Sequence, residues 1–327
     1  MIGRLAPSPT GAQHVGNART YIIAWLSARR QGGKVALRIE DIDSPRVKPG
    51  AAAQALDELR WLGLDWDGEI VVQTDRLAAY QVALDRLARQ EAIYPCTCTR
   101  ADIERAASAP HLEHEGPVYP GTCRARSASD AAALTASGKL FSWRFRLPVE
   151  TPAFDDLFRG RCAVDLHQVG GDFVVWKSPR AVGEASTPAY QLAVVVDDAA
   201  QGVTEVVRGD DLVPSTPRQL LLYAALGETA PRFAHVPLVV GEDGRRLAKR
   251  HGDTRLAALR EAGVSASTLR GLLAWSCGWI DRVEPVGVGE LLPLFRLDLI
   301  PPAAFVLSAR ALHRMGHTPS DTSQGKG

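Results

Sequence analysis

Hydrophobic positions in the first forty residues change from strand spacing to helical spacing and back. Residues 2–6 are predicted to form a short strand, and apolar side chains recur at helical spacing over 18–30, before the glycine pair at 32–33. A second buried-type run follows at 35–39. The pattern predicts strand, helix and strand. Such a βαβ unit implies a parallel sheet whose ligand lies beyond the carboxyl ends of the strands.

The rest of the chain divides into segments of different character. Helical spacing returns at 49–63 and 75–92. From 95 to 126 there is no clear periodicity, and Cys, His, Pro and Gly are frequent, which indicates the start of an inserted module. The predicted units are the first half of a nucleotide-binding core (1–95), the insertion (96–185), the second half of the core (186–253), a helical stem (254–312) and a disordered tail (313–327).

Shorter patterns predict individual helices and strands within these units. The insertion is predicted to hold a small sheet, built from 141–147 and part of 165–176. In the second half of the core, Ser215 or Thr216 is predicted to cap a helix that ends near Gly227. A strand is predicted at 236–240, followed by a turn and a basic run at 245–250. The stem is predicted to be all-helical.

Composition narrows the possible functions only a little. The chain has 327 residues, of which 46% are apolar and 23% charged, as in ordinary globular proteins. Its net charge of +1 neither requires nor excludes a polyanionic partner, so any nucleic-acid contact has to come from local patches. The apolar runs are too short to cross a bilayer, and no charged-then-apolar leader begins the chain. We therefore expect a cytoplasmic protein.

The loop after the first strand is a candidate anion site. Pro7 and Pro9 prevent it from being helical, and it ends in His14-Val15-Gly16-Asn17 where the helix is predicted to begin. Helix N-terminal amides attract phosphate, and glycine lets a ligand approach the backbone. The same residues also fit a capped turn without a ligand. A Walker-type phosphate loop is absent from the sequence.

Three of the five cysteines lie close together in the sequence, at Cys96, Cys98 and Cys123. An odd, clustered set argues against a disulfide framework and, in a reducing compartment, indicates a metal site. A structural zinc takes four ligands in a tetrahedron. Because imidazole is the usual partner of thiolates, the residues alone nominate His111 or His114 as the fourth ligand. The alternative is three reduced cysteines without a metal.

Four blocks of the sequence resemble the class I glutamyl-tRNA synthetases, in the same order. They are RLAPSPTGAQHVGNAR (4–19), LRIEDIDSPR (37–46), YQLAVVVDD with GVTEVVRGDD (190–211), and RLAKR (246–250). The first contains a counterpart of the family's HIGH element at 14–17, and the last stands where its KMSKS loop lies. The resemblance implies an α/β fold with the Rossmann-like parallel-sheet core of class I synthetases, a zinc-bearing insertion and a C-terminal helical stem.

The resemblance also implies roles for residues within these blocks. It implies ATP as a substrate, with Mg²⁺, and catalytic roles for His14 and Lys249, which neutralise the phosphates while the glutamate carboxylate attacks the α-phosphorus. The implied L-glutamate-binding residues are Arg4, Leu5, Ala6, Pro7, Ser8, Glu40, Tyr190 and Arg208. The implied ATP-binding residues are His14, Gly16, Asn17 and Lys249. Chemistry agrees, since buried carboxylates need cationic partners and a buried ammonium needs an acceptor. Taken singly, Tyr190 also fits a core aromatic, Glu40 a helix cap and Arg208 a surface ion pair.

For the cysteine cluster, the resemblance points to Tyr119 as the fourth zinc ligand, beside Cys96, Cys98 and Cys123. Two departures from the family pattern lie near the implied site. Val194 stands where full-length synthetases usually carry Asn, and Ala248 replaces the usual Ser of the lysine loop.

Full-length members of the family continue well past the lysine loop into an anticodon-binding region, whereas only a short segment follows residue 250 here. In this respect the chain resembles one branch of the family, the glutamyl-queuosine tRNA(Asp) synthetases. This branch implies a ligase that activates glutamate without tRNA and transfers it to the queuosine base in the anticodon of tRNA(Asp), with no obligate protein partner. The sequence leaves two alternative hypotheses for the function open. One is a truncated glutamyl-tRNA synthetase that charges a tRNA 3′ end, and the other is a non-catalytic tRNA-binding relative.

Overall fold

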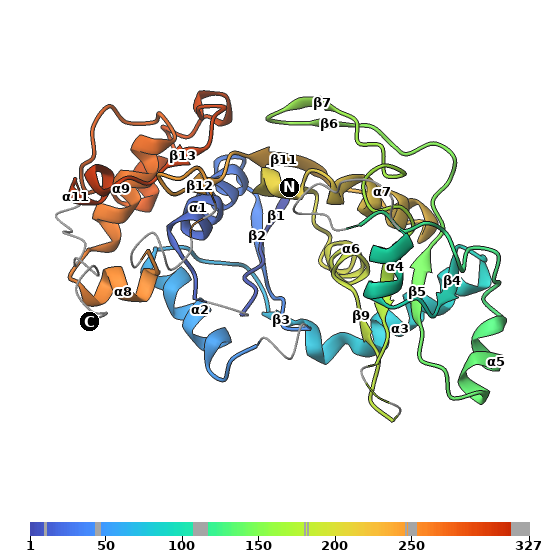
Figure 1. The fold of residues 1–327 in the computed structure, drawn as a ribbon. Coiled ribbons are helices and arrows are strands. Elements are labelled where there is room, and N and C mark those ends of the chain that lie inside the picture. The colour runs from blue at the N-terminus through green and yellow to red at the C-terminus, as the bar shows by residue number, and fades with distance from the viewer. Residues whose placement is uncertain are drawn as a thin grey trace, which may run out of the picture.

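The computed structural model of the chain describes residues 1–9, 12–42, 47–106, 117–179, 181, 183–245, 247 and 254–314. Figure 1 shows the C-terminal helices on one side, the parallel strands and α1 in the middle, and most of the inserted segment on the other side. The predicted tail lies almost wholly outside the described residues.

The first βαβ unit forms as the sequence predicts. Strands β1 (Ile2–Leu5) and β2 (Lys34–Ile39) pair in parallel, and α1 (Val15–Arg30) connects them. A short β3 (Val71–Val72) extends the sheet beyond β2. Helix α1 begins three residues before the predicted start because His14 caps it. The next elements are α2 (Ala51–Trp61), the 3-10 turn η2 (Gln73–Arg76) and α3 (Leu77–Arg89).

A second parallel sheet continues the first. The backbone N–H of Thr204 donates to the carbonyl of Ile2 (2.9 Å), which places β10 (Glu205–Gly209) beside β1. Strand β11 (Arg232–Val236) pairs in parallel with β10. The connecting elements are α6 (Tyr190–Ala200), η3 (Asp210–Leu212) and α7 (Ser215–Ala225).

The predicted cap of α7 is wrong. Pro214 occupies the N-cap position, and no side chain caps the helix. Thr216 is fully buried instead, and its hydroxyl accepts a hydrogen bond from Arg208 (2.8 Å). The polar residue that looked like a capping group therefore serves the interior of the protein.

The insertion contains the predicted small sheet and one feature that was not predicted. Strands β4 (Ile93–Cys96), β5 (Ser142–Phe145), β8 (Phe173–Lys177) and β9 (Thr187–Pro188) form an antiparallel sheet in that order. Helices α4 (Arg100–Ala106) and α5 (Asp130–Ala136) accompany it. The hairpin of β6 (Phe154–Asp156) and β7 (Gly160–Cys162) instead joins the edge of β11. The insertion thus adds strands to the sheet of the core.

Two predictions for the C-terminal part of the chain are wrong. Pro237 interrupts the predicted strand at 236–240, because proline cannot donate to a ladder, so β11 ends at Val236 and β12 (Val239–Val240) is separate. The stem is not all-helical, since β13 (Phe305–Val306) pairs with β12. Its other elements are α8 (Leu256–Glu261), α9 (Ala266–Ser276), α10 (Val288–Leu291), η5 (Leu297–Leu299) and α11 (Ala309–His313).

The C-terminal helices share one apolar core with α1. Leu269, Leu272 and Leu273 pack in the same buried cluster as the apolar side of α1. Inside this interface the buried Arg19 donates to Ser276 Oγ (3.0 Å) and to the carbonyl of Pro237 (2.8 Å). The backbone of 254–256 also pairs with the segment before α1, through Val15 N to Thr254 O (3.1 Å) and Leu256 N to Gln13 O (2.9 Å).

Candidate active site

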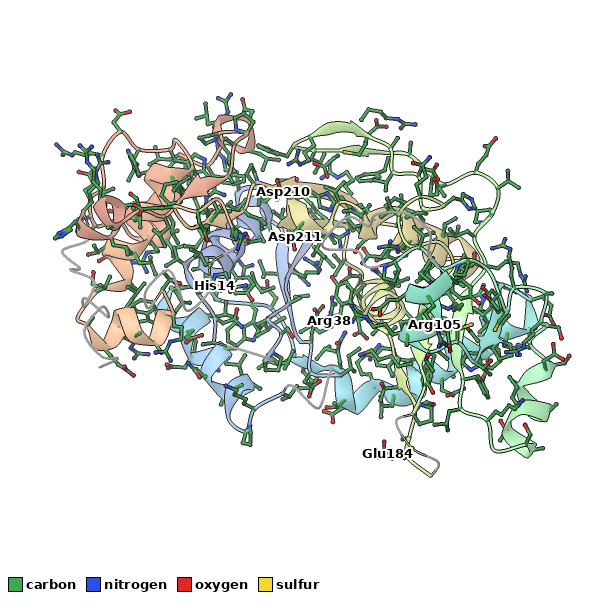
Figure 2. The ribbon with its side chains drawn as sticks, viewed as in Figure 1. His14, Arg38, Arg105, Glu184, Asp210 and Asp211 are labelled. Atoms are coloured by element: carbon green, nitrogen blue, oxygen red, sulfur yellow. The ribbon has the colours of Figure 1, made fainter. Side chains whose placement is uncertain are left out.

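A cavity of about 420 Å³ opens at the carboxyl ends of β1, β2 and β10, where the βαβ pattern predicts a ligand. Figure 2 shows His14, Arg38 and Asp211 in this middle region, between the C-terminal helices and the insertion. Of the predicted site residues, the cavity is lined by Arg4, Ala6, His14, Gly16, Asn17, Glu40, Tyr190 and Arg208. These side chains come from distant stretches of the sequence.

One wall of the cavity is the start of α1. His14 Nδ1 accepts from Gly16 N (3.1 Å), and Asn17 Oδ1 accepts from His14 N (3.1 Å), which together form a capping box. A Cβ at Gly16 would lie 3.0 Å from His14 Cε1 and 3.4 Å from Val239 Cβ, so a larger residue there would crowd the cap. The capped turn weighed in the sequence analysis is present, and it lies at the cavity.

A buried ion-pair network supports the opposite wall. Arg38 is fully buried and pairs with Asp198 (2.8 Å), Glu40 (3.1 Å) and Asp197 (3.7 Å). Arg4 Nε lies 3.4 Å from the same Asp198. Burial raises the pKa of Glu40 above its usual range, although Arg38 and Arg4 oppose that shift. Glu40 is thus a partly screened carboxylate facing the cavity and does not cap a helix.

Arg208 differs from Arg4 and Arg38, the other two arginines beside the cavity, in its partners. Its guanidinium donates to His235 Nε2 (2.9 Å), Gln219 Oε1 (2.8 Å) and Thr216 Oγ1 (2.8 Å). Among the residues that the structure describes, no carboxylate forms an ion pair with it. Burial lowers the pKa of Arg208, which remains a cation because arginine does not deprotonate in proteins. A buried cation held by neutral groups is suited to an anionic ligand.

Tyr190 is the first residue of α6 and lines the cavity together with its charged groups. Burial raises the pKa of Tyr190, and the charge of Glu40 adds to the shift, while Arg208 and Arg4 oppose it. Arg4, Glu40, Tyr190 and Arg208 therefore act on one another electrostatically. The structure brings together these four of the eight residues that the resemblance assigns to glutamate binding, and Ala6 lines the same cavity.

Some predicted residues lie apart from the cavity lining. Leu5 is fully buried in the apolar core, and Ser8 Oγ donates to the carbonyl of Glu40 (3.2 Å). Val194 is buried in a second apolar cluster around α6 and does not line the cavity. Lys249, Ala248, Arg246 and Arg250 lie outside the described residues, as do His111 and His114.

Sequence reasoning missed several lining residues. Thr20, Tyr21 and Ala24 follow Asn17 at helical spacing on one face of α1, so that spacing was an available signal. Asp211 ends one of the matched blocks but had no predicted role. The other lining residues that were not predicted are Val207, Gly209, Leu212, Leu238, Val239 and Leu247.

The three clustered cysteines form a second candidate site in the insertion. The sulfurs of Cys96, Cys98 and Cys123 all lie within 4.8 Å of one another, so the cluster can hold a metal ion. Tyr119 Oη accepts from Cys123 N (2.8 Å) and lies 3.4 Å from Cys96 Sγ. Burial, reinforced by the neighbouring Cys96, raises the pKa of Cys98 to about 11. A divalent cation is the ordinary means of stabilising such crowded thiolates.

Comparison with known proteins agrees with this geometry. Residues 1–279 match the family described as class I tRNA synthetases (E and Q), catalytic domain. The chain is 51% identical over 310 residues to a glutamyl-Q tRNA(Asp) synthetase of Symbiobacterium thermophilum, covering 92% of this chain and 94% of that protein. The chain belongs to the glutamyl-Q tRNA(Asp) synthetase family. The predicted family and α/β fold class are thereby confirmed.

Two further comparisons agree with this family assignment. A glutamyl-Q tRNA(Asp) synthetase of Rhodopirellula baltica is 53% identical over 281 residues, covering 84% of each chain. The crystal structure of a glutamate tRNA ligase from Elizabethkingia meningosepticum, in complex with its amino acid, superposes with a TM-score of 0.79 at 26% identity. That match covers 96% of this chain and 68% of the ligase.

No described helix is long and apolar enough to span a membrane.

Proposed function

We propose that this protein is a cytoplasmic ligase that activates L-glutamate with ATP, without tRNA, and transfers the glutamyl group to the queuosine base in the anticodon of tRNA(Asp). The observation that carries the proposal is Arg208, a buried cation at the cavity whose described hydrogen bonds all go to neutral groups. Membership of the glutamyl-Q tRNA(Asp) synthetase family supports the identity of the acceptor.

The proposed reaction assigns a task to each wall of the cavity. Arg4 and Arg208 hold the substrate carboxylates, Glu40 accepts hydrogen bonds from the ammonium group, and Tyr190 and Ala6 complete the lining of the amino-acid pocket. A carboxylate oxygen of glutamate attacks the α-phosphorus of ATP, and pyrophosphate leaves with the electrons of the broken P–O bond. A hydroxyl of the queuosine ring then attacks the acyl carbon and releases AMP. No protein nucleophile is required, since placement and charge stabilisation carry both steps.

On the nucleotide side, His14, Gly16, Asn17 and Lys249 hold the phosphates in this proposal. Mg²⁺ supplies additional positive charge to the phosphates when bound. The described residues on either side of Lys249 support its assignment, since Leu247 lines the cavity and Thr254 accepts a hydrogen bond from Val15 at the start of α1.

Two assays on the purified protein test the proposal. We expect glutamate-dependent exchange between ATP and pyrophosphate without added tRNA, and its absence rejects the enzymatic function. We also expect labelled glutamate to be transferred to queuosine-containing tRNA(Asp), and the label to survive periodate treatment of the 3′ end. The matched control is tRNA(Asp) without queuosine, which should accept no label. Label on tRNA(Glu) would instead favour a truncated glutamyl-tRNA synthetase.

We further propose that the insertion binds one structural zinc ion through Cys96, Cys98, Cys123 and Tyr119. Tetrahedral zinc with Zn–S near 2.3 Å separates two sulfurs by about 3.8 Å and a sulfur from an oxygen by about 3.5 Å. The Cys98–Cys123 sulfur distance is 3.6 Å, and the Cys96 sulfur lies 3.4 Å from Tyr119 Oη. Arg144 lies over the Tyr119 ring, 3.9 Å from its centroid, which favours an electron-rich phenolate. The donor set therefore fits the metal.

Replacement of the oxygen ligand tests this assignment. We expect Tyr119→Phe to weaken zinc binding by about ten-fold or more, because one ligand is lost while the ring still packs. His114→Ala is the matched variant and should keep the zinc content of the unmodified protein. Metal analysis after competition with a chelator measures both. The opposite result, zinc lost only in His114→Ala, would assign the fourth position to the histidine.

A further inference from the structure

Arg208 belongs to a buried chain of three charged or titratable side chains from adjacent strands. Asp156 on β6 contacts His235 on β11, and His235 contacts Arg208 on β10. The distances are 2.6 Å from Asp156 Oδ2 to His235 Nδ1 and 2.9 Å from His235 Nε2 to Arg208 Nε. All three residues are at most 5% exposed. The chain ends at the cavity, where Arg208 is the lining residue.

The partners determine the protonation of His235. A guanidinium has only donors, so Nε2 has to accept the Arg208 Nε–H, and Thr216 Oγ1 is also within 3.1 Å of it. Nδ1 consequently carries the proton and donates it to Asp156. Burial lowers the pKa of His235 although Asp156 opposes the shift, which keeps the imidazole neutral. The carboxylate is held in turn by the backbone N–H groups of Phe158 (3.0 Å) and Arg159 (2.9 Å), both on Oδ1.

This arrangement orients the guanidinium without pairing it directly with a carboxylate. A carboxylate in direct contact with Arg208 would occupy the donors and offset the charge that a ligand needs. The neutral imidazole accepts one hydrogen bond and places the acid one residue further away. The guanidinium also stacks over the ring of Phe233, with its central carbon 5.0 Å from the ring centroid, as in a cation–π interaction. The cation is thus held rigidly and keeps its charge toward the cavity.

We propose that Asp156 and His235 are positioning residues for amino-acid binding, in which Asp156 fixes the imidazole tautomer and the imidazole orients Arg208 toward the substrate carboxylate. The inference rests on the proposed function, since it takes glutamate as the ligand of Arg208. It also gives the insertion a direct part in the amino-acid site. Asp156 lies in the predicted insertion, and it reaches the core because β6 pairs with β11.

Asp156→Asn separates this role from simple packing, because it keeps the shape of the side chain. Oδ1 accepts from the backbone N–H groups of Phe158 and Arg159 and shares that of His235 with Oδ2, so the new amide nitrogen has to replace Oδ2 and donate to Nδ1. The imidazole proton then moves to Nε2 and opposes the Arg208 Nε–H. We expect the KM for glutamate in ATP–pyrophosphate exchange to rise about ten-fold or more, with little change in the KM for ATP. The matched control is Asp155→Asn, an exposed carboxylate one residue away, which should leave both values unchanged.

Nitrogen-15 NMR of the imidazole provides a readout that packing alone would not move. We expect the Nδ1–H tautomer in the unmodified protein and the Nε2–H tautomer in Asp156→Asn, with the resonance assigned by its loss in His235→Gln. An Nε2–H tautomer or an imidazolium in the unmodified protein at neutral pH overturns the proposal without any variant. A folded Asp156→Asn protein with the KM of the Asp155→Asn control overturns it as well. Absence of exchange in the unmodified protein would reject the proposed function alone, because the tautomer would still be measured.

Discussion

Replacing Arg208 with glutamine should raise the KM for glutamate by about thirty-fold to several thousand-fold in ATP–pyrophosphate exchange. The range follows from about 2–5 kcal/mol for the loss of one partner from a buried, hydrogen-bonded charge pair. Arg208 is 4% exposed, and its described hydrogen bonds go only to His235, Gln219 and Thr216, so no second charge in contact with it would be stranded by the substitution. The loss should therefore appear in ligand binding more than in folding.

Two comparisons make this result specific. Arg161→Gln removes an exposed arginine of the neighbouring hairpin and should not change the KM for glutamate. Arg208→Lys keeps the charge but loses the planar fork, so its KM should fall between those of the glutamine variant and the unmodified protein. If folded Arg208→Gln protein kept a KM within about three-fold of the unmodified value, Arg208 would not hold a substrate carboxylate.

The largest effect on stability is expected at Arg38. Arg38→Met leaves Asp197, Asp198 and Glu40 facing one another in the interior without their shared cation. Breaking a buried pair in this way costs about 3–5 kcal/mol. Because whole domains are stable by only about 5–15 kcal/mol, we expect a large fall in the urea midpoint of unfolding at neutral pH.

The sign of the pH dependence identifies the cause. Arg38 opposes the burial that raises the pKa of Glu40, so in Arg38→Met this carboxyl should bind a proton more readily, and acidification should reduce the stability difference from the unmodified protein. The control is Arg100→Met, whose ion pair with Glu104 lies on the surface and should contribute no measurable stability. A stability difference that stays constant from pH 7 to pH 4 would show that lost packing, and not stranded charge, is responsible.

Local sequence pattern predicts the elements of the core and fails where the interior overrides it. The apolar runs of β1 and β2 and the spacing in α1 are strong local signals, and all three elements form. The run at 236–240 looked like one strand because Val236, Val239 and Val240 are apolar, but Pro237 cannot take part in a ladder. Strand β13 has only two residues and forms only because β12 lies beside it.

The candidate site was predictable only because four blocks of the sequence resemble those of the glutamyl-tRNA synthetases. Nothing in local pattern places Arg4, Glu40, Tyr190 and Arg208 together, because their convergence depends on tertiary structure. His235 lies inside an apolar strand and has no motif around it, so its contact with Arg208 could not be foreseen. Thr216 shows the reverse case, since its position suggested a helix cap while its hydroxyl is used by Arg208.

The interface between α1 and the C-terminal helices has a consequence for how the enzyme can be divided. A fragment that stops before Thr254 would put the leucine-facing side of α1 into water and leave the Arg19 guanidinium without Ser276. His14 is the N-cap residue of that same helix, and its backbone forms an antiparallel β-bridge with Arg255 of the C-terminal part. The stem and the start of α1 at the cavity therefore share one folded core, and a chain cut between them should lose the shape of the cavity as well as the stem.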